Sequence, residues 1–146
     1  HTKLIETSGI INDSMPDYVV ERSSKILNRF KKPMNGSKIL VLGVAYKQDI
    51  DDVRQSPALK VIEGLEREGC IVDYYDAYVK KYNYKGEEKE SIKELNKEIL
   101  KEADLVIITT AHTNVNYDFV QANAKFIFDT KNVMKNVKNR ENIELL

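Results

Sequence analysis

The sequence predicts an α/β fold in which a doubly wound parallel sheet follows a long helix. Short apolar runs recur at 39–42, 71–75, 105–109 and 126–128. The first three are about 30 residues apart, the length of one strand–helix–strand unit. Each run is continuous rather than alternating in polarity, as expected of strands that helices cover on both faces. Amphipathic patterns between the runs supply those helices, so a Rossmann-like architecture is expected.

Length and composition indicate one domain with a short appended element. The 146 residues are 42% hydrophobic and 32% charged, and 23 basic residues balance 23 acidic ones. Zero net charge argues against a nucleic-acid binder with a broad cationic face. No apolar run approaches the roughly 20 residues of a membrane span and no signal peptide opens the chain. We therefore expect a cytoplasmic protein with no nucleic-acid or membrane partner. A chain that begins with His1 rather than Met suggests a fragment.

The first 33 residues predict a long helix that enters from a preceding part of the protein. Apolar side chains keep a helical spacing, at Ile11, Met15, Val19, Ile26 and Phe30. Pro16 either kinks this helix or starts its second part, because proline removes a backbone hydrogen bond. The breaker residues of 31–36 then separate the helix from the first strand.

The clearest short helix lies between the first two strands. Its apolar residues follow the i, i+3, i+4, i+7 spacing, at Ala58, Val61, Ile62 and Leu65. Ser56-Pro57 is expected to begin it, since a serine hydroxyl caps free backbone N–H groups and the φ of proline suits the first helical position. Gly69 is expected to close it.

Two further helices and a loop are predicted downstream. Ser91-Ile92-Lys93-Glu94 has the pattern of a capping box at the start of a helix with a solvated Lys/Glu face. A shorter helix near 116–123 leads to the fourth strand. Residues 80–90 are polar, contain Gly86 and predict a mobile loop. The tyrosines around this loop are expected mainly to pack: Tyr74, Tyr75, Tyr78, Tyr82 and Tyr84.

The segment 43–58, GVAYKQDIDDVRQSPA, carries the densest chemistry of the chain. It lies at the carboxyl end of the first strand, where doubly wound sheets bind ligands. Its only glycine is Gly43, and the G-x-G-x-x-G spacing that holds the pyrophosphate of NAD is absent. Lys47 either binds a phosphate or sugar oxygen as a point charge or pairs with Asp49 as an ordinary surface lysine.

Two other sets of charges at this edge also have alternative interpretations. Arg54 with Asp51 and Asp52 is expected to form a salt-bridge set that orders the loop rather than a ligand clamp. Such pairs contribute little stability when exposed, so their expected role is to shape the loop. Lys131 follows the fourth strand and is either an ordinary loop lysine or a second cation that meets Lys47 across the sheet edge.

The cysteine and histidines narrow the possible chemistry. Cys70 is the only cysteine, so an internal disulfide is excluded, and its context favours a small buried residue over a nucleophile. The two histidines cannot form a zinc site alone, so no metal is expected. His112 ends the third strand, but as a general base it would need a partner that the sequence does not identify.

The sequence GVAYKQDIDDVRQSPALKVIEGL resembles the C-terminal-domain signature of the nucleotide-sugar 6-dehydrogenases, which act on UDP-glucose, UDP-N-acetylglucosamine, UDP-N-acetylmannosamine or GDP-mannose. IINDSMPDYVVER resembles the end of the long central helix of that family, and FIFDTKN its closing strand and turn. These matches lie in order and span residues 10–132. TTAHTNVNYDFV with FIFDTKN looks most like the N-acetylhexosamine branch, and UDP-glucose stays open as the alternative.

The resemblance implies that 1–33 is the end of a central, dimer-forming helical region and 34–146 a C-terminal UDP-sugar-binding domain. Enzymes of this family oxidise the C6 hydroxyl of the sugar to a carboxylate in two NAD-dependent steps through an active-site cysteine. Their N-terminal Rossmann domain binds the NAD. The lysine of the family's AYK motif contacts the nucleotide-sugar and maps onto Lys47, with Tyr46 beside it. The basic residue after the closing strand maps onto Lys131.

The sequence departs from the family pattern at several places. Lys131 replaces the usual arginine, so a bidentate contact to a phosphate or carboxylate is lost. Gln55 stands where glutamate is usual and Ala77 where proline is usual. The chain lacks the glycine fingerprint and the cysteine motif, and Cys70 lies in the wrong context to be the nucleophile. The fragment alone is therefore expected to be inactive. A non-catalytic Rossmann-like interaction module and an autonomous oxidoreductase are the alternatives.

Overall fold

The computed structural model describes residues 2–146, with side chains described from Ser14 onward. A five-stranded sheet in the order β2-β1-β5-β6-β7 forms its centre, and every neighbouring pair of strands is parallel. Its strands are β1 (Lys38–Leu42), β2 (Ile71–Tyr75), β5 (Leu105–Ile108), β6 (Ile127–Asp129) and β7 (Ile143–Leu145). The predicted doubly wound parallel sheet is confirmed. The short strand β7 was not predicted.

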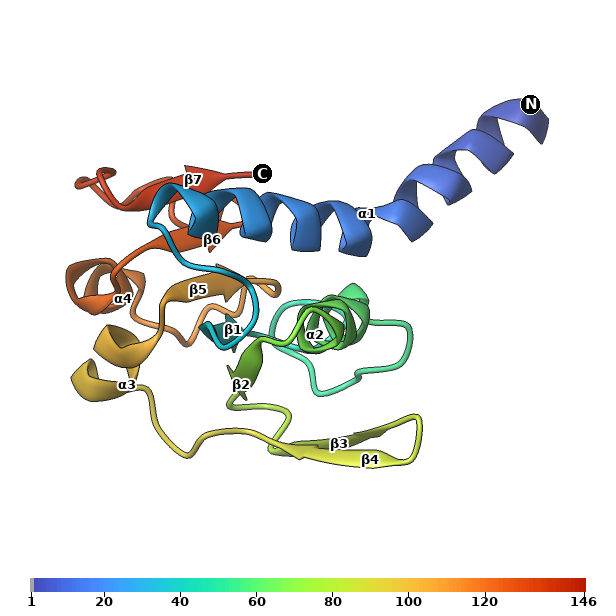
Figure 1. Cartoon of the computed structure of the whole chain (residues 1–146). Helices are drawn as coiled ribbons and strands as arrows, with labels where there is room; N and C mark the ends of the chain where they lie inside the picture. The colour runs from blue at the N-terminus through green and yellow to red at the C-terminus, as the bar shows by residue number, and fades with distance from the viewer. Residues whose placement is uncertain (1) are drawn as a thin grey trace.

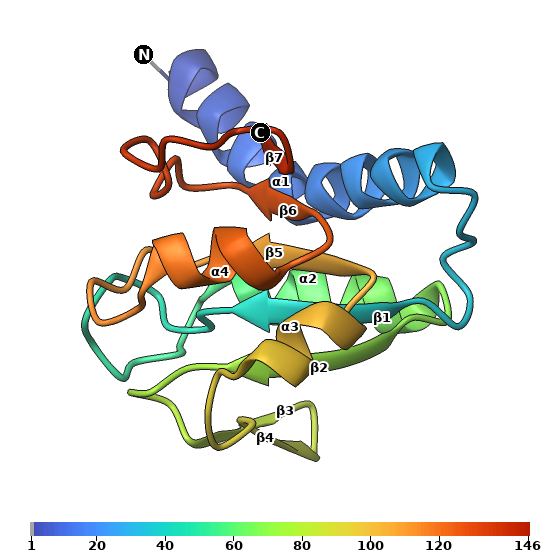
Figure 2. The ribbon, with the colours of Figure 1, turned by 90° about the vertical axis from the view of Figure 1, so that its left-hand side faces the viewer.

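Helices cover both faces of this sheet (Figures 1 and 2). They are α1 (Thr2–Arg29) and α2 (Pro57–Arg67) on one face, and α3 (Lys97–Glu102) and α4 (Tyr117–Asn123) on the other. Side chains of β1 alternate between the two cores. Ile39 and Val41 pack with α1 and α2, whereas Leu40 and Leu42 pack with α3 and α4. Burial on both faces explains why the strands appear in the sequence as continuous apolar runs.

Helix α2 follows the sequence prediction except at its cap. It begins at Pro57, and the chain reverses at Gly69, whose φ of +91° suits glycine. The Ser56 hydroxyl makes no capping hydrogen bond and instead donates to the Ala45 carbonyl at 3.4 Å. The expected serine cap is therefore wrong, because the hydroxyl ties the helix to the loop after β1.

Helix α3 begins later than the sequence pattern predicts. Asn96 is its cap, and the Asn96 side chain accepts the Ile99 N–H at 2.9 Å. The predicted capping box at Ser91 is wrong. The Ser91 hydroxyl accepts the Asp76 N–H at 3.0 Å and donates to the Ile92 carbonyl at 2.8 Å, so it joins the end of β2 to this connection.

A β-hairpin of β3 (Lys81–Tyr84) and β4 (Glu87–Glu90) replaces the loop expected at 80–90. Its two turn residues, Lys85 and Gly86, both have positive φ, as tight hairpins require. Ion pairs to α2 hold it, with Nζ–O distances of 2.7 Å for both Lys85–Glu63 and Lys89–Glu66. The predicted packing role holds for Tyr74 and Tyr82, which are buried with ring centroids 5.3 Å apart.

The predicted long helix is confirmed as α1, which contains Pro16 and changes direction along its length (Figure 1). The structure thus favours the kink alternative at Pro16. Ile11 lies outside the residues with described side chains, and His1 lies outside the described residues. Among the residues that the structure describes, no helix is long and apolar enough to cross a membrane.

Strand β7 is an edge strand of the sheet and contacts α1. The Arg22 guanidinium donates to the Glu144 carboxylate at 2.9 Å and to the Leu145 carbonyl at 2.7 Å, and it lies over the Phe128 ring. Arg29 also contacts Glu144. These contacts fix the second half of α1 along the β6–β7 edge, and so they fix one wall of the site described next.

Candidate functional site

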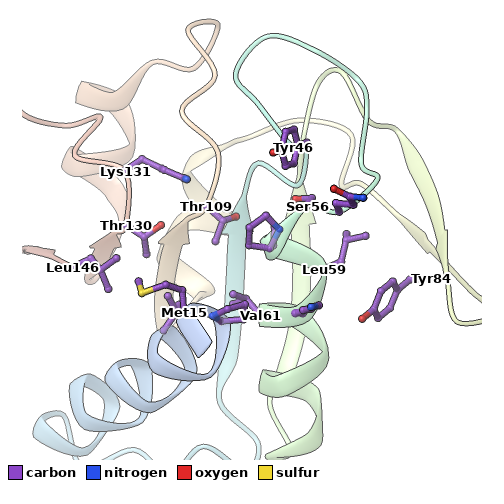
Figure 3. A pocket seen from close by; sticks show the side chains of 16 residues that line it. Met15, Tyr46, Ser56, Leu59, Val61, Tyr84, Thr109, Thr130, Lys131 and Leu146 are labelled. Carbon is purple, nitrogen blue, oxygen red and sulfur yellow. The ribbon is translucent and has the colours of Figure 1, made fainter. Parts of the chain in front are cut away.

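A groove of about 640 Å³ lies at the carboxyl edge of the sheet, between α1, the start of α2 and the ends of β5 and β6 (Figure 3). Its volume is within the range of small-molecule sites. Met15, Val19 and Leu59 contribute an apolar side. The polar side chains that line it come from several connections and also from α2 and β3: Tyr46, Gln55, Ser56, Lys60, Tyr84, Thr109, Thr130 and Lys131.

The groove lies beside the point at which the strand order reverses. From β1 the chain passes through α2 to β2, whereas β5 lies on the other side of β1. Connections that leave β1 and β5 therefore diverge and open a crevice at their carboxyl ends, where doubly wound folds bind ligands. The connections 43–56 and 109–116 are the two sides of this crevice.

Gly43 brings these two connections into close contact. Its φ is +88°, and a Cβ added there would lie 2.4 Å from the Thr110 Cβ. The space that a glycine leaves is therefore filled by Thr110, whose hydroxyl donates to the Ala45 carbonyl at 2.8 Å. Dinucleotide folds use the glycines of this turn for close approach to a pyrophosphate. This turn does not fit that group.

Asp76 is the buried anchor of the crevice, with 1% of its surface exposed. Its carboxylate accepts the N–H groups of Val44 at 2.8 Å and Ala45 at 3.2 Å, and also those of Tyr78 and Val79. Burial alone raises the pKa of this carboxyl, but the hydrogen bonds from His112 and from the backbone outweigh burial and lower the pKa below its ordinary value. Asp76 therefore stays ionised and holds the ends of β1 and β2 together.

His112 completes this network and is itself buried. Its Nε2 lies 2.8 Å from the Asp76 carboxylate, and its Nδ1 accepts the Asp49 N–H at 2.8 Å. A backbone N–H can only donate, so Nδ1 carries no proton and Nε2–H donates to Asp76. The ring of Tyr78 packs on the imidazole, with centroids 4.8 Å apart. His112 has the partner that the sequence could not identify, but it lies among protein groups rather than in the groove lining.

The loop after β1 is fixed from both sides. The Asp49 carboxylate accepts the Thr113 N–H at 2.9 Å and the Thr113 hydroxyl at 2.8 Å, and these bonds lower the pKa of Asp49. Asp49 has a φ of +60°, an unfavourable conformation for a residue with a Cβ. The Tyr46 N–H donates to the Asp52 carbonyl at 2.7 Å and closes the loop on itself. Hydrogen bonds to His112 and Thr113 thus hold Asp49 in this conformation.

Tyr46 and Lys47 are both exposed on this loop, and Tyr46 lines the groove. The Lys47 ammonium lies 5.8 Å from the Tyr46 ring centroid and forms no ion pair within the described part of the chain. The alternative pairing of Lys47 with Asp49 is not seen among the described residues, where the Asp49 carboxylate accepts two hydrogen bonds from Thr113. Lys47 is not among the residues that line the groove.

Arg54 and Asp52 form a two-pronged ion pair. Nε–H donates to Oδ1 at 3.1 Å and Nη2–H to Oδ2 at 2.9 Å, which lowers the pKa of Asp52 to about 2. The Arg54 side chain is 87% exposed, so the pair contributes little stability. Asp51 forms no ion pair with Arg54 in the described residues. The predicted set therefore contains Asp52 and Arg54 only.

Lys131 lies on the opposite side of the groove from Tyr46 (Figure 3). The buried Asp129 carboxylate accepts the N–H groups of Lys131, Val133 and Met134 and shapes the turn after β6. The structure brings Lys131 and Tyr46 to one groove. It does not bring Lys47 into that lining, so the alternative in which the two lysines meet is not seen.

Cys70 lies away from the groove and is buried, as predicted. Burial, aided by the nearby Glu68 charge, raises the pKa of its thiol to about 11. The thiolate is the nucleophilic form, so Cys70 is not a nucleophile at neutral pH.

Sequence reasoning missed Asp76 and Thr113. Asp76 directly follows the second apolar run, so its position at a strand end marks it as a candidate site residue. Its five hydrogen-bond donors come from three separate connections, which no local pattern specifies.

The fold and groove define a Rossmann-like domain with a groove beside the switch point of its sheet. Residues 40–136 match the model of the UDP-glucose/GDP-mannose dehydrogenase family, UDP binding domain. The chain belongs to this family.

Individual relatives agree with this assignment. UDP-N-acetyl-D-mannosamine dehydrogenase of Methanocaldococcus jannaschii is 36% identical over 142 residues, which cover 92% of this chain and 30% of that protein. The structure of UDP-D-ManNAc dehydrogenase from Pyrococcus horikoshii matches with a TM-score of 0.79 at 28% identity, over 97% of this chain and 33% of that one. UDP-N-acetyl-mannosamine dehydrogenase from Staphylococcus aureus matches with a TM-score of 0.72 at 35% identity, over 98% and 32%. The chain thus spans about a third of the length of these relatives.

Proposed function

We propose that this chain is the UDP-sugar-binding part of an NAD-dependent UDP-N-acetylhexosamine 6-dehydrogenase, with UDP-N-acetyl-D-mannosamine as the sugar nucleotide. The observation that carries the proposal is the family match over residues 40–136, which includes the connections on both sides of the groove. The names of the relatives from M. jannaschii and S. aureus support the choice of sugar. The complete enzyme oxidises the C6 hydroxyl of the sugar first to an aldehyde and then to a carboxylate.

In this proposal the residues around the groove bind and orient the substrate. Lys131 and Lys47 supply positive charge to the diphosphate, each as a single ammonium group. Tyr46 offers an aromatic face at the groove and packs against the nucleotide-sugar. Asp52 and Arg54 shape the loop that carries Tyr46 and Lys47. The division into a helical region at 1–33 and a binding domain at 34–146 is part of the same proposal.

The hydride acceptor does not bind at the turn after β1 in this proposal. When bound, NAD accepts the hydride. The turn after β1 has no room for its pyrophosphate, because Thr110 fills the space at Gly43 and the other fingerprint glycines are absent. Since Cys70 is buried with a raised thiol pKa, these residues supply no nucleophile either. We therefore assign NAD and the cysteine to a part of the enzyme outside these residues.

Titration with UDP tests the proposal in the complete gene product that carries this chain. Isothermal calorimetry is expected to detect UDP binding, and Lys131→Ala and Lys47→Ala each weaken it about ten- to a hundredfold, since a contact to a charged group is worth about 1.5–3 kcal/mol. Lys101→Ala, on α3 and away from the groove, is the matched control and leaves affinity unchanged. Absence of UDP binding in the wild type, or wild-type affinity in both the Lys131→Ala and the Lys47→Ala variant, contradicts the proposal.

We also infer that α1 contributes to a homodimer or a higher homo-oligomer. Its first half extends away from the sheet (Figure 1), and Tyr18 on its second half is partly exposed. Light scattering of the complete gene product after size exclusion tests this inference, and a monomeric mass overturns it. A cytoplasmic location stays a prediction.

A further inference from the structure

One buried imidazole connects the core of the domain to the loop after β1. His112 gives its Nε2–H to the Asp76 carboxylate at 2.8 Å, and its Nδ1 accepts the Asp49 N–H at 2.8 Å. Asp76 is the more firmly held end, since four backbone N–H groups also bind its carboxylate. His112 thus lies between Asp76 and the middle of the loop, where its Nδ1 supplies the acceptor for the Asp49 N–H.

The loop depends on such contacts because it has no regular secondary structure of its own. Residues 43–56 contain no helix or strand, and Tyr46 and Lys47 are exposed. Asp49 and Gln55 both have positive φ without being glycine, a conformation that persists only when surrounding contacts enforce it. At Asp49 those contacts come from His112 and Thr113, on the other side of the crevice.

We propose that His112 is a positioning residue that holds the loop 46–55 in the conformation that presents Tyr46 and Lys47 to the nucleotide-sugar. The inference rests on the proposed function for its ligand. It assigns His112 no contact with substrate and no proton transfer. A loop fixed before binding loses less conformational entropy when the ligand binds, so release of this contact lowers affinity.

Two substitutions separate the contacts of the imidazole. Glutamine places its amide nitrogen near the position of Nε2, so His112→Gln keeps a donor to Asp76 and loses the acceptor for the Asp49 N–H. Asparagine places its carbonyl oxygen near the position of Nδ1, so His112→Asn keeps that acceptor and loses the contact with Asp76. The two variants thus have opposite expected effects on the loop and on the core.

Hydrogen–deuterium exchange of the complete gene product tests the positioning without any ligand. Exchange in peptides covering 46–55 is expected to be faster in His112→Gln than in wild type and near wild type in His112→Asn. Thermal unfolding is expected to show the reverse, with the larger loss of stability in His112→Asn, since Asp76 loses a donor. Unchanged exchange at 46–55 in a folded His112→Gln variant overturns the proposal.

UDP titration then tests the consequence for binding. His112→Gln is expected to raise the Kd for UDP about tenfold, the cost of one hydrogen bond, and His112→Asn to restore affinity toward wild type. Equal losses in both variants, or none in His112→Gln, overturn the link between loop and ligand. A wild type that binds no UDP refutes the proposed function instead, and the exchange experiment still decides whether His112 positions the loop.

Discussion

At the scale of single residues, the site depends on close contacts that leave little room for change. Gly43 lets the end of β1 touch Thr110, and Asp76 collects donors from three connections. Neither residue lines the groove, yet both decide where the residues that do line it are placed. Substitutions at such positions alter the site through geometry rather than through lost ligand contacts.

Gly43→Ala is expected to destabilise the domain strongly, and Gly86→Ala is its matched control. Both glycines have positive φ, but only at Gly43 would the new Cβ meet protein atoms. The left-handed conformation costs an alanine about 1–2 kcal/mol, and overpacking adds about 1–3 kcal/mol. Urea unfolding of both variants measures the difference. Equal losses of unfolding free energy at the two positions would show that the clash with Thr110 does not destabilise the Gly43→Ala variant.

At the scale of elements, the sequence pattern predicted the apolar strands and helices well and the polar elements poorly. The four apolar runs became β1, β2, β5 and β6 because burial on both faces leaves a continuous signal. The β3–β4 hairpin was missed because its strands are polar and are held by lysine–glutamate pairs to α2. Strand β7 has three residues, too few for a pattern.

The start of α3 offers a direct test of which polar residue caps it. Asn96→Ala is expected to cost about 1 kcal/mol, because its side chain accepts the Ile99 N–H. Asn116→Ala is a matched comparison, since Asn116 caps α4 through the Phe119 N–H and should cost a similar amount. Chemical denaturation measures both. If Asn96→Ala leaves stability unchanged, the helix begins elsewhere.

The candidate site was predictable only in part, for a physical reason. The resemblance to the family pointed to Tyr46, Lys47 and Lys131, and the structure brings Tyr46 and Lys131 together at the groove. Their roles in binding stay predictions. Sequence reasoning could not find that Asp76 is the partner of His112. These two residues are 36 positions apart in the chain and meet only because β2 and β5 lie on the two sides of β1.

At the scale of the whole molecule, the groove exists because α1 and the last strand are joined. Met15 and Leu146 line the same groove, one from each end of the described side chains. Arg22 and Arg29 of α1 converge on Glu144 of β7 and hold these ends together. The shape of the site therefore depends on contacts at the edge of the sheet remote from β2.

Glu144→Gln is expected to loosen α1 from β7. It removes the charge from two guanidinium contacts, so a loss of about 1–3 kcal/mol in unfolding free energy is expected. Glu21→Gln is the matched control, since Glu21 forms one exposed pair with Lys25 and should change stability by less than about 0.5 kcal/mol. Thermal and chemical unfolding compare the two. Similar small effects in both variants would contradict the structural importance of the Glu144 contacts.

The packing of Tyr78 on His112 offers a way to observe the loop in solution. The chain has eight tyrosines and no tryptophan, so an indole at Tyr78 contributes a tryptophan emission that none of the other residues of this sequence can produce. Tyr78 is partly exposed and lies outside the groove lining, with its ring against the imidazole. The emission of a Tyr78→Trp variant thus reports the environment of His112 directly and gives an optical record of when the crevice changes shape.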